Sequence, residues 1–173
     1  KQPAMIRNSF LALFVTCIFL TSLQAQKPPA YSLEKWASGT TSLPIANSGP
    51  DARTAYFGNI EGVAMDGAGR VYFTASDAHR VFRLNADGSY VAVAGTGVGG
   101  TPTDGKQATQ SQLSYPQDVA FDAAGNMYIA SYNRVYKVTP DGAIRTIAGG
   151  GDSGASGEGQ LATKASLNDV RAV

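Results

Sequence analysis

Two stretches of this chain repeat one pattern of apolar, charged and turn residues. VAMDGAGRVYFTAS, at Val63–Ser76, aligns with VAFDAAGNMYIASY, at Val119–Tyr132. After a two-residue deletion, HRVFRLNADG from His79 aligns with NRVYKVTPDG from Asn133. A repeat of this length is one supersecondary unit that buries its apolar faces against its neighbours, so the chain is predicted to be a repeat protein.

The connecting segments repeat as well. DGKQATQSQL from Asp104 matches EGQLATKASL from Glu158, and GPDARTAYFGNIEGVA from Gly49 matches GKQATQSQLSYPQDVA from Gly105. A third copy opens at the final residues NDVRAV. The complete units therefore cover about residues 60–115 and 116–169, each about 55 residues long.

Each unit holds four strand-like runs separated by turn signals. In the second unit the runs are Asp118–Phe121, Met127–Ser131, Arg134–Val138 and Ile144–Ala148. The turn sequences DGAG, DAAG, NADG and TPDG place Asp or Asn early and Gly where a positive φ is needed. Four antiparallel strands repeated by rotation form a propeller blade. The predicted fold is all-β: a partial β-propeller of four-stranded antiparallel blades, with about two complete blades plus flanking parts.

The second unit closely resembles the NHL repeat. The pattern positions are occupied by Pro116, Val119, Asp122, Gly125, Asn126, Tyr128, Asn133, Arg134, Val135 and Gly142. The following TIAGGG…GEGxxATxAxL resembles the long-repeat subtype of bacterial secreted proteins and of the teneurin NHL propeller. The resemblance covers residues 33–173; His79 departs from the usual Asn, and Val170 departs from the usual Pro.

The chain begins with residues typical of an export signal. After four upstream residues (1–4), residues 5–25 show a basic start at Arg7, an apolar core at Phe10–Leu20 and a short polar exit ending at Ala25. That layout predicts a secretory signal peptide, followed by a linker at 26–32. We expect a periplasmic, extracellular or cell-surface protein with no membrane insertion after cleavage, although an uncleaved anchor is the alternative.

Composition excludes some classes of partner. Without Lys1 and Arg7, 12 of the 14 Lys and Arg residues remain against 13 Asp and Glu, so the exported part is nearly neutral. A nearly neutral chain with no basic run provides no footprint for nucleic acid. Closed propellers have about four to eight blades, so we expect the remaining blades of a longer protein to be partners of this chain.

Few residues are candidates for a site. His79, Arg80, Arg134 and Tyr132 are the candidate ligand contacts, although each arginine is expected to serve ion pairing (with Asp77 or Asp141) or packing first. The glycine pattern GTGVGG at Gly95–Gly100 recurs as GGGDSG at Gly149–Gly154, which indicates repeat architecture rather than a dinucleotide site. No catalytic residue, metal-ligand set or cofactor is identified, and the acidic loops lack the alternating ladder of a calcium loop.

The function expected from these observations is binding. The NHL resemblance implies a scaffold whose loops hold protein or carbohydrate ligands outside the cytoplasm. The alternative is a propeller lyase or lactonase with its metal site in blades missing from this chain. Only Asp118 and Glu61 lie near the innermost strands as acidic side chains, which favours a binding module over an enzyme.

Overall fold

The computed structural model describes residues 45–150 and 157–173. The predicted signal peptide at 5–25, the residues before it and the linker at 26–32 lie outside the described residues, as do residues 33–44 of the repeat region. In the described part of the chain, no helix is long and apolar enough to cross a lipid bilayer.

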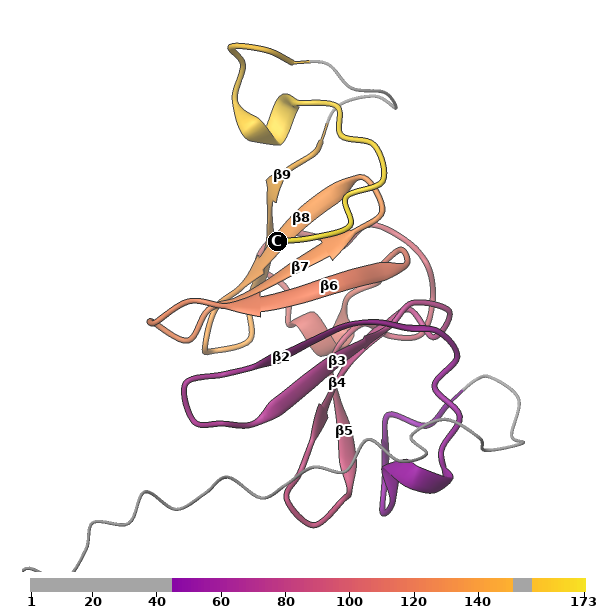
Figure 1. Cartoon of the computed structure of the whole chain (residues 1–173). Coiled ribbons are helices and arrows are strands. Elements are labelled where there is room, and N and C mark those ends of the chain that lie inside the picture. Colours follow the sequence, from indigo (N-terminus) through magenta and orange to yellow (C-terminus); the bar gives the residue numbers. More distant parts are fainter. Residues whose placement is uncertain (1–44, 151–156) are drawn as a thin grey trace, which may run out of the picture. The chain divides into compact units, whose positions relative to one another are not determined.

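Two antiparallel sheets form the described structure (Figure 1). The first has the order β1-β5-β4-β3-β2 and the second the order β6-β7-β8-β9. The strands of the first are β1 (Ser48–Gly49), β2 (Ile60–Met65), β3 (Val71–Ala75), β4 (Arg80–Leu84) and β5 (Tyr90–Ala94). Those of the second are β6 (Pro116–Phe121), β7 (Met127–Ser131), β8 (Arg134–Val138) and β9 (Ile144–Ala148). The predicted all-β fold with two four-stranded blades is confirmed, and the short β1 is an addition to the first blade.

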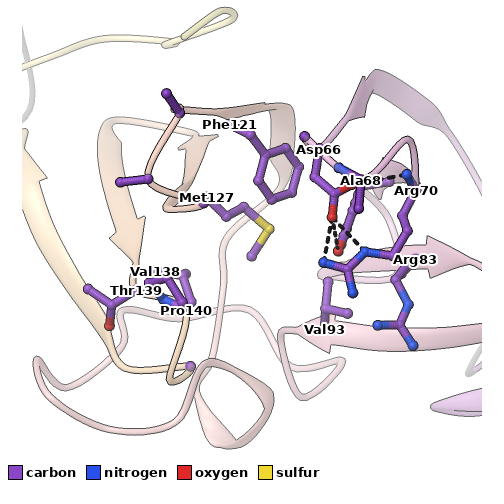
Figure 2. Close-up of a pocket in the computed structure, with 16 residues that line it drawn as sticks. Asp66, Ala68, Arg70, Arg83, Val93, Phe121, Met127, Val138, Thr139 and Pro140 are labelled. Atoms are coloured by element: carbon purple, nitrogen blue, oxygen red, sulfur yellow. Dashed lines mark hydrogen bonds and ion pairs between the residues drawn. The ribbon is translucent and has the colours of Figure 1, made fainter.

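An aspartate organises the first turn of each blade. In the β2–β3 turn, Asp66 Oδ1 accepts from the amides of Ala68 and Arg70 at 3.0 Å, and Asp66 Oδ2 accepts from the Tyr72 hydroxyl at 3.1 Å (Figure 2). Gly69 completes the turn at φ 76°. Asp122 makes the matching bonds in the β6–β7 turn. The repeated Asp and Gly are therefore required by the turn, as their spacing indicates.

The connecting segments form hydrogen bonds with the blades. Each contains a short 3-10 helix: η1 (Ala52–Thr54), η2 (Ala108–Gln110) and η3 (Ala162–Lys164). The Ala108 amide donates to the Gly142 carbonyl in the second blade, and the Ala108 carbonyl accepts from the Gly95 amide of the first, both at 2.9 Å. Just before η2, Gln107 bridges to Ala143 beside β9, as β1 pairs with β5. The outer edge of each blade is thus partly paired, which reduces edge-to-edge aggregation.

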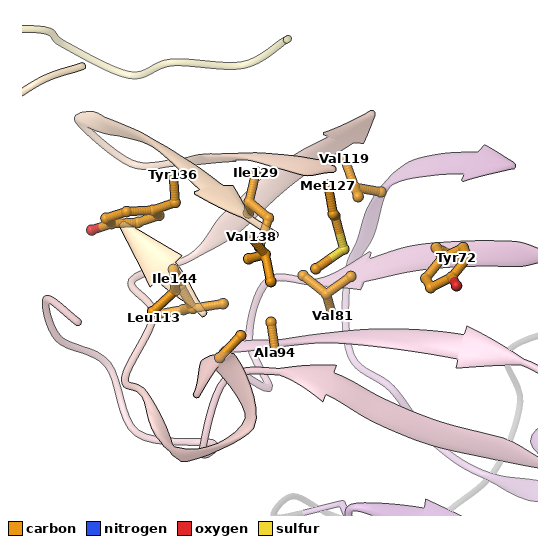
Figure 3. Close-up of a cluster of buried hydrophobic side chains, with 11 residues drawn as sticks. Tyr72, Val81, Ala94, Leu113, Val119, Met127, Ile129, Tyr136, Val138 and Ile144 are labelled. Carbon is orange, nitrogen blue, oxygen red and sulfur yellow. The ribbon is translucent and has the colours of Figure 1, made fainter. Parts of the chain in front are cut away.

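The main core lies between the blades (Figure 3). Its fully buried centre contains Val81 and Ala94 from the first blade and Ile129, Tyr136 and Ile144 from the second. On β3 and β4 the side chains of this core alternate with residues on the opposite face, as the period of two requires, whereas a register shift in the β4–β5 pair puts both Val93 and Ala94 of β5 against this core.

One polar side chain is buried in this interface. Thr74 Oγ1 accepts from the Gly62 amide at 2.8 Å and donates to the Gln117 carbonyl, across the two blades, at 3.2 Å. The pairing satisfies the buried hydroxyl and at the same time fixes the position of β6 against β2 and β3.

The other face of the first blade is only partly covered. Phe57, from the segment before β2, packs its ring within 5.0 Å of Phe73, Phe82 and Tyr90. On β2, however, Val63 and Met65 are each 64% exposed. Their counterparts in the second blade, Val119 and Phe121, contact the first blade, and Val119 is 2% exposed. The open face of β2 therefore carries apolar residues at the positions that, in the second blade, pack against the neighbouring blade.

Removal of Ile129 from the interface should destabilise the chain. The side chain is fully buried, so Ile129→Ala leaves a cavity and should lower the free energy of unfolding by about 2–5 kcal/mol. Val98 is 55% exposed, and Val98→Ala is the control, expected to change it by less than about 0.5 kcal/mol. Urea unfolding followed by circular dichroism measures both values. Equal effects would contradict the assignment of this interface as the core.

The open face of β2 should drive association. We expect the chain from Gln26 onward to form oligomers as its concentration rises, because exposed apolar surface of this kind is buried by contact with another chain. Val63→Ser with Met65→Gln should shift the population toward monomer in analytical ultracentrifugation, whereas Val98→Ser should not. A chain that is monomeric over the whole concentration range would contradict this expectation.

Candidate functional site

The connections gather at two opposite ends of the blades. In an antiparallel meander, the β3–β4 and β7–β8 turns and the long connections that lead into the next blade emerge at one end, here called the loop end. The β2–β3, β4–β5, β6–β7 and β8–β9 turns emerge at the other, here called the turn end. The four candidate ligand contacts from the sequence all lie at the loop end, within or next to the β3–β4 and β7–β8 turns.

His79 joins the two blades at the loop end. It ends the β3–β4 turn with φ 52°, and its ring meets the Tyr115 ring edge-on with centroids 4.6 Å apart. Its Nδ1 accepts from the Tyr115 amide at 3.2 Å. Burial lowers the pKa of His79, an effect that Asp77 opposes and Arg80 reinforces. A hydrogen bond into Nδ1 needs the neutral imidazole and acts in the same direction.

Tyr115 and Tyr132 flank the first residue pair of the β6–β7 ladder at this end. Tyr115 immediately precedes Pro116 and Tyr132 immediately follows Ser131, and these two residues are paired in the β6–β7 ladder. The tyrosines have φ values of 47° and 55°, which are uncommon for a bulky side chain. Their side chains are 50% and 52% exposed. Sequence reasoning identified Tyr132 but missed Tyr115, although an aromatic residue directly before the proline that begins an inner strand was a usable signal.

The opening residues of the third repeat complete the cluster. The Val170 amide donates to the Tyr132 carbonyl at 2.6 Å, and Gln117 Nε2 donates to Asp169 Oδ1 at 2.9 Å. Asp169 also forms an ion pair with Arg171. The bond from Gln117, and then the contacts with Arg171, lower the pKa of Asp169. We call His79, Tyr115, Tyr132, Gln117 and Asp169 the loop-end cluster.

The two candidate arginines make hydrogen bonds within the protein. Arg80 is 7% exposed, and its guanidinium donates to the carbonyls of Ile45 at 3.1 Å and Thr96 at 2.7 Å. Burial lowers the pKa of Arg80. Among the described residues, Arg80 Nε and Thr96 Oγ1 are buried without a hydrogen-bond partner. Arg134 is half-buried and donates to Thr101 and Asn133 side chains at 3.3 and 3.4 Å.

The ion pairs that the sequence predicted for these arginines do not form in the described structure. Asp77 accepts a hydrogen bond from the Asn59 amide, and Asp141 lies in the β8–β9 turn at the end opposite Arg134. For Arg80 the sequence predicted either ion pairing or packing, and the structure shows packing. Gly97, at φ 89°, leaves room for the Arg80 guanidinium, since an added Cβ at Gly97 would collide with the Arg80 side chain.

The acidic and glycine-rich candidates have ordinary structural contacts. The Asp118 carboxylate accepts from the Val173 amide at 3.0 Å, and Asp104 accepts from the Thr146 amide at 2.8 Å. After Gly95–Gly100 the next helical element is the three-residue η2, which begins eight residues later at Ala108, so no helix begins directly after these glycines. Residues 45–150 and 157–173 contain no group of three His, Cys, Asp or Glu side chains placed to hold a metal ion.

Comparison with solved structures identifies the fold. The chain is similar to an auxiliary nutrient binding protein from Bacteroides ovatus, with 22% identity and a TM-score of 0.54 over 68% of this chain and 32% of that one. An auxiliary nutrient binding protein from Bacteroides thetaiotaomicron matches at 19% identity and a TM-score of 0.51, over 64% and 31%. A Bacteroides thetaiotaomicron protein of unknown function matches at 22% and 0.53, over 61% and 27%.

These likenesses concern the fold, which is of the β-propeller type. The chain spans about a third or less of the length of each of these structures. No protein-family model and no curated protein matches the sequence.

The folded state should lose stability in acid through His79. Its pKa is lowered from the ordinary 6.5, so below that pH the unfolded chain binds more protons than the folded one. The free energy of unfolding should therefore fall as the pH drops from about 7 toward 5. His79→Asn, which copies Asn133 of the second blade, should remove this component. Urea unfolding across this pH range measures the effect, and an imidazole that titrates in NMR at or above pH 6.5 would contradict it.

Proposed function

We propose that this chain is part of an exported NHL-repeat propeller that binds a protein or carbohydrate ligand at its loop end. The observation that carries the proposal is the pair of half-exposed tyrosines, Tyr115 and Tyr132, which flank the paired residues Pro116 and Ser131 and have left-handed conformations. Unfavourable backbone conformations of this kind persist where the surrounding structure imposes them, and they concentrate at ligand sites. The NHL assignment rests on the repeat motifs, and export rests on the signal-like residues 5–25.

The chemistry of the cluster favours a carbohydrate. Tyrosine combines a rigid apolar ring with a polar hydroxyl and loses little conformational entropy when a ligand covers it. Gln117 and Asp169, which bond to each other, add an amide and a carboxylate to the cluster, and such groups are suitable partners for hydroxyl groups. Two of the similar structures are named auxiliary nutrient binding proteins, which agrees with a binding role.

The alternative function is a propeller lyase or lactonase whose metal site lies in blades missing from this chain. No observation on the two described blades specifically favours that reaction. The loop-end cluster favours binding through its exposed tyrosine rings.

Loss of the two rings should abolish carbohydrate binding. A glycan array would identify oligosaccharides held by the chain, and calorimetry would measure their affinity. Tyr115→Ala and Tyr132→Ala should each weaken binding by roughly tenfold or more. Tyr56, which is 39% exposed in the segment before β2, provides the control Tyr56→Ala, expected to leave the affinity unchanged. Equal losses in all three variants, or array signals unaffected by the double variant, would contradict the proposed site.

A further inference from the structure

A cleft of about 500 Å³ opens between the two blades at the turn end, away from the loop-end cluster (Figure 2). Its volume falls within the range of small-molecule sites, roughly 300–1,000 Å³. The first blade contributes the β2–β3 turn and strand residues of β4 and β5, and the second contributes the β6–β7 and β8–β9 turns.

The inner wall of the cleft is apolar. Val93 of the first blade lies opposite Phe121, Met127 and Val138 of the second (Figure 2). Val93 and Phe121 are partly buried at the margin of the core between the blades, and the Phe121 ring lies 4.5 Å from the Tyr72 ring by centroids. This wall offers a flat aromatic surface and a flexible thioether, which together adapt to an apolar ligand.

The polar wall has an excess of one positive charge. Asp66, Arg70 and Arg83 are the charged residues that line the cleft. Asp66 and Arg70 neutralise each other in an ion pair at 2.6 Å, and the Tyr72 hydroxyl also donates to that carboxylate. The charge of Arg83 is not neutralised by another residue that lines the cleft. Within the described residues, Arg83 makes one hydrogen bond, which Nε donates to Asn85 Oδ1 at 3.2 Å. Its terminal nitrogens are therefore available to an incoming acceptor.

The same position in the second blade provides a contrast. Lys137 pairs with Tyr128 across β7 and β8, as Arg83 pairs with Tyr72 across β3 and β4. The Lys137 ammonium lies over the Tyr128 ring, 5.5 Å from its centroid, and Lys137 does not line the cleft. A guanidinium binds a carboxylate through two parallel hydrogen bonds, whereas an ammonium acts as a point charge. Arg83 is thus the cation with the chemistry for an anionic group at this cleft.

We propose that the cleft binds a small organic anion, with an aromatic or branched apolar body against Val93, Phe121 and Met127 and a carboxylate paired with Arg83. The apolar wall supplies affinity for the body, and the single uncompensated guanidinium supplies selection for a negative charge. This site is separate from the loop-end cluster and does not depend on its function.

The test compares two probes of matched shape, 3-phenylpropionate and the neutral 3-phenylpropanol, by NMR titration of the whole chain. The carboxylate should bind with a dissociation constant of roughly 1 mM or tighter and shift the resonances of Val93 and Met127. Arg83→Gln should weaken its binding by about tenfold, whereas Lys137→Gln should leave it unchanged. Val93→Phe, which fills the cleft and keeps Arg83, should also prevent binding.

Several results would overturn the proposal. Binding of the alcohol as tightly as the carboxylate would remove the role of Arg83, and so would equal affinity in the wild type and Arg83→Gln. Absence of carboxylate binding at millimolar concentration would remove the site. Loss of binding in Tyr115→Ala and Tyr132→Ala with the cleft variants unaffected would place the ligand at the loop end. The tyrosine variants test only the proposed site at the loop end, so failure of that site is distinguishable from failure of the cleft.

Discussion

The burial of apolar surface between adjacent blades is the constraint on which the rest of this structure depends. Each blade is a thin sheet with two apolar faces, so neither face is satisfied by the hydrogen bonds of the sheet itself. Ile129, Tyr136 and Ile144 of the second blade belong to the same buried cluster as Val81 and Ala94 of the first. That contact sets the position of every connection at the loop end and of the cleft at the turn end. It also explains why Val63 and Met65, the unmatched counterparts of Val119 and Phe121, remain exposed.

The connections between blades convert this packing into a defined geometry. Ala108 is 1% exposed and bonds to one blade through its amide and to the other through its carbonyl. Its side chain belongs to the buried core between the blades. The segment then returns to the loop end and places Tyr115 against His79. The residues of the loop-end cluster thus come from neighbouring repeats, and each gains its position from the contact between them.

The repeated residues and the non-repeated residues have different roles. Asp66 and Asp122 close equivalent turns, and Gly95 and Gly149 stand at equivalent ends of the outer strands. Two of the positions that differ between the repeats carry polar side chains at the proposed sites. His79 replaces Asn133, and Arg83 replaces Lys137. Side-chain differences between blades of the same backbone structure allow one fold to present different surfaces between successive blades.

The sequence by itself determined the blades, because alternation along a strand and the turn residues Asp, Asn and Gly act over a few residues. Residues 127–131, 134–138 and 144–148 were predicted as strands with the bounds that the structure shows. The tertiary structure alone decided the contacts between repeats. The burial of Arg80 on two carbonyls, the pairing of Tyr115 with His79 and the cleft beside Arg83 each join segments that are distant in the chain. The periodicity of the sequence predicts on which face of a strand a side chain lies. Which residue of the neighbouring blade it contacts depends on how the two blades pack together.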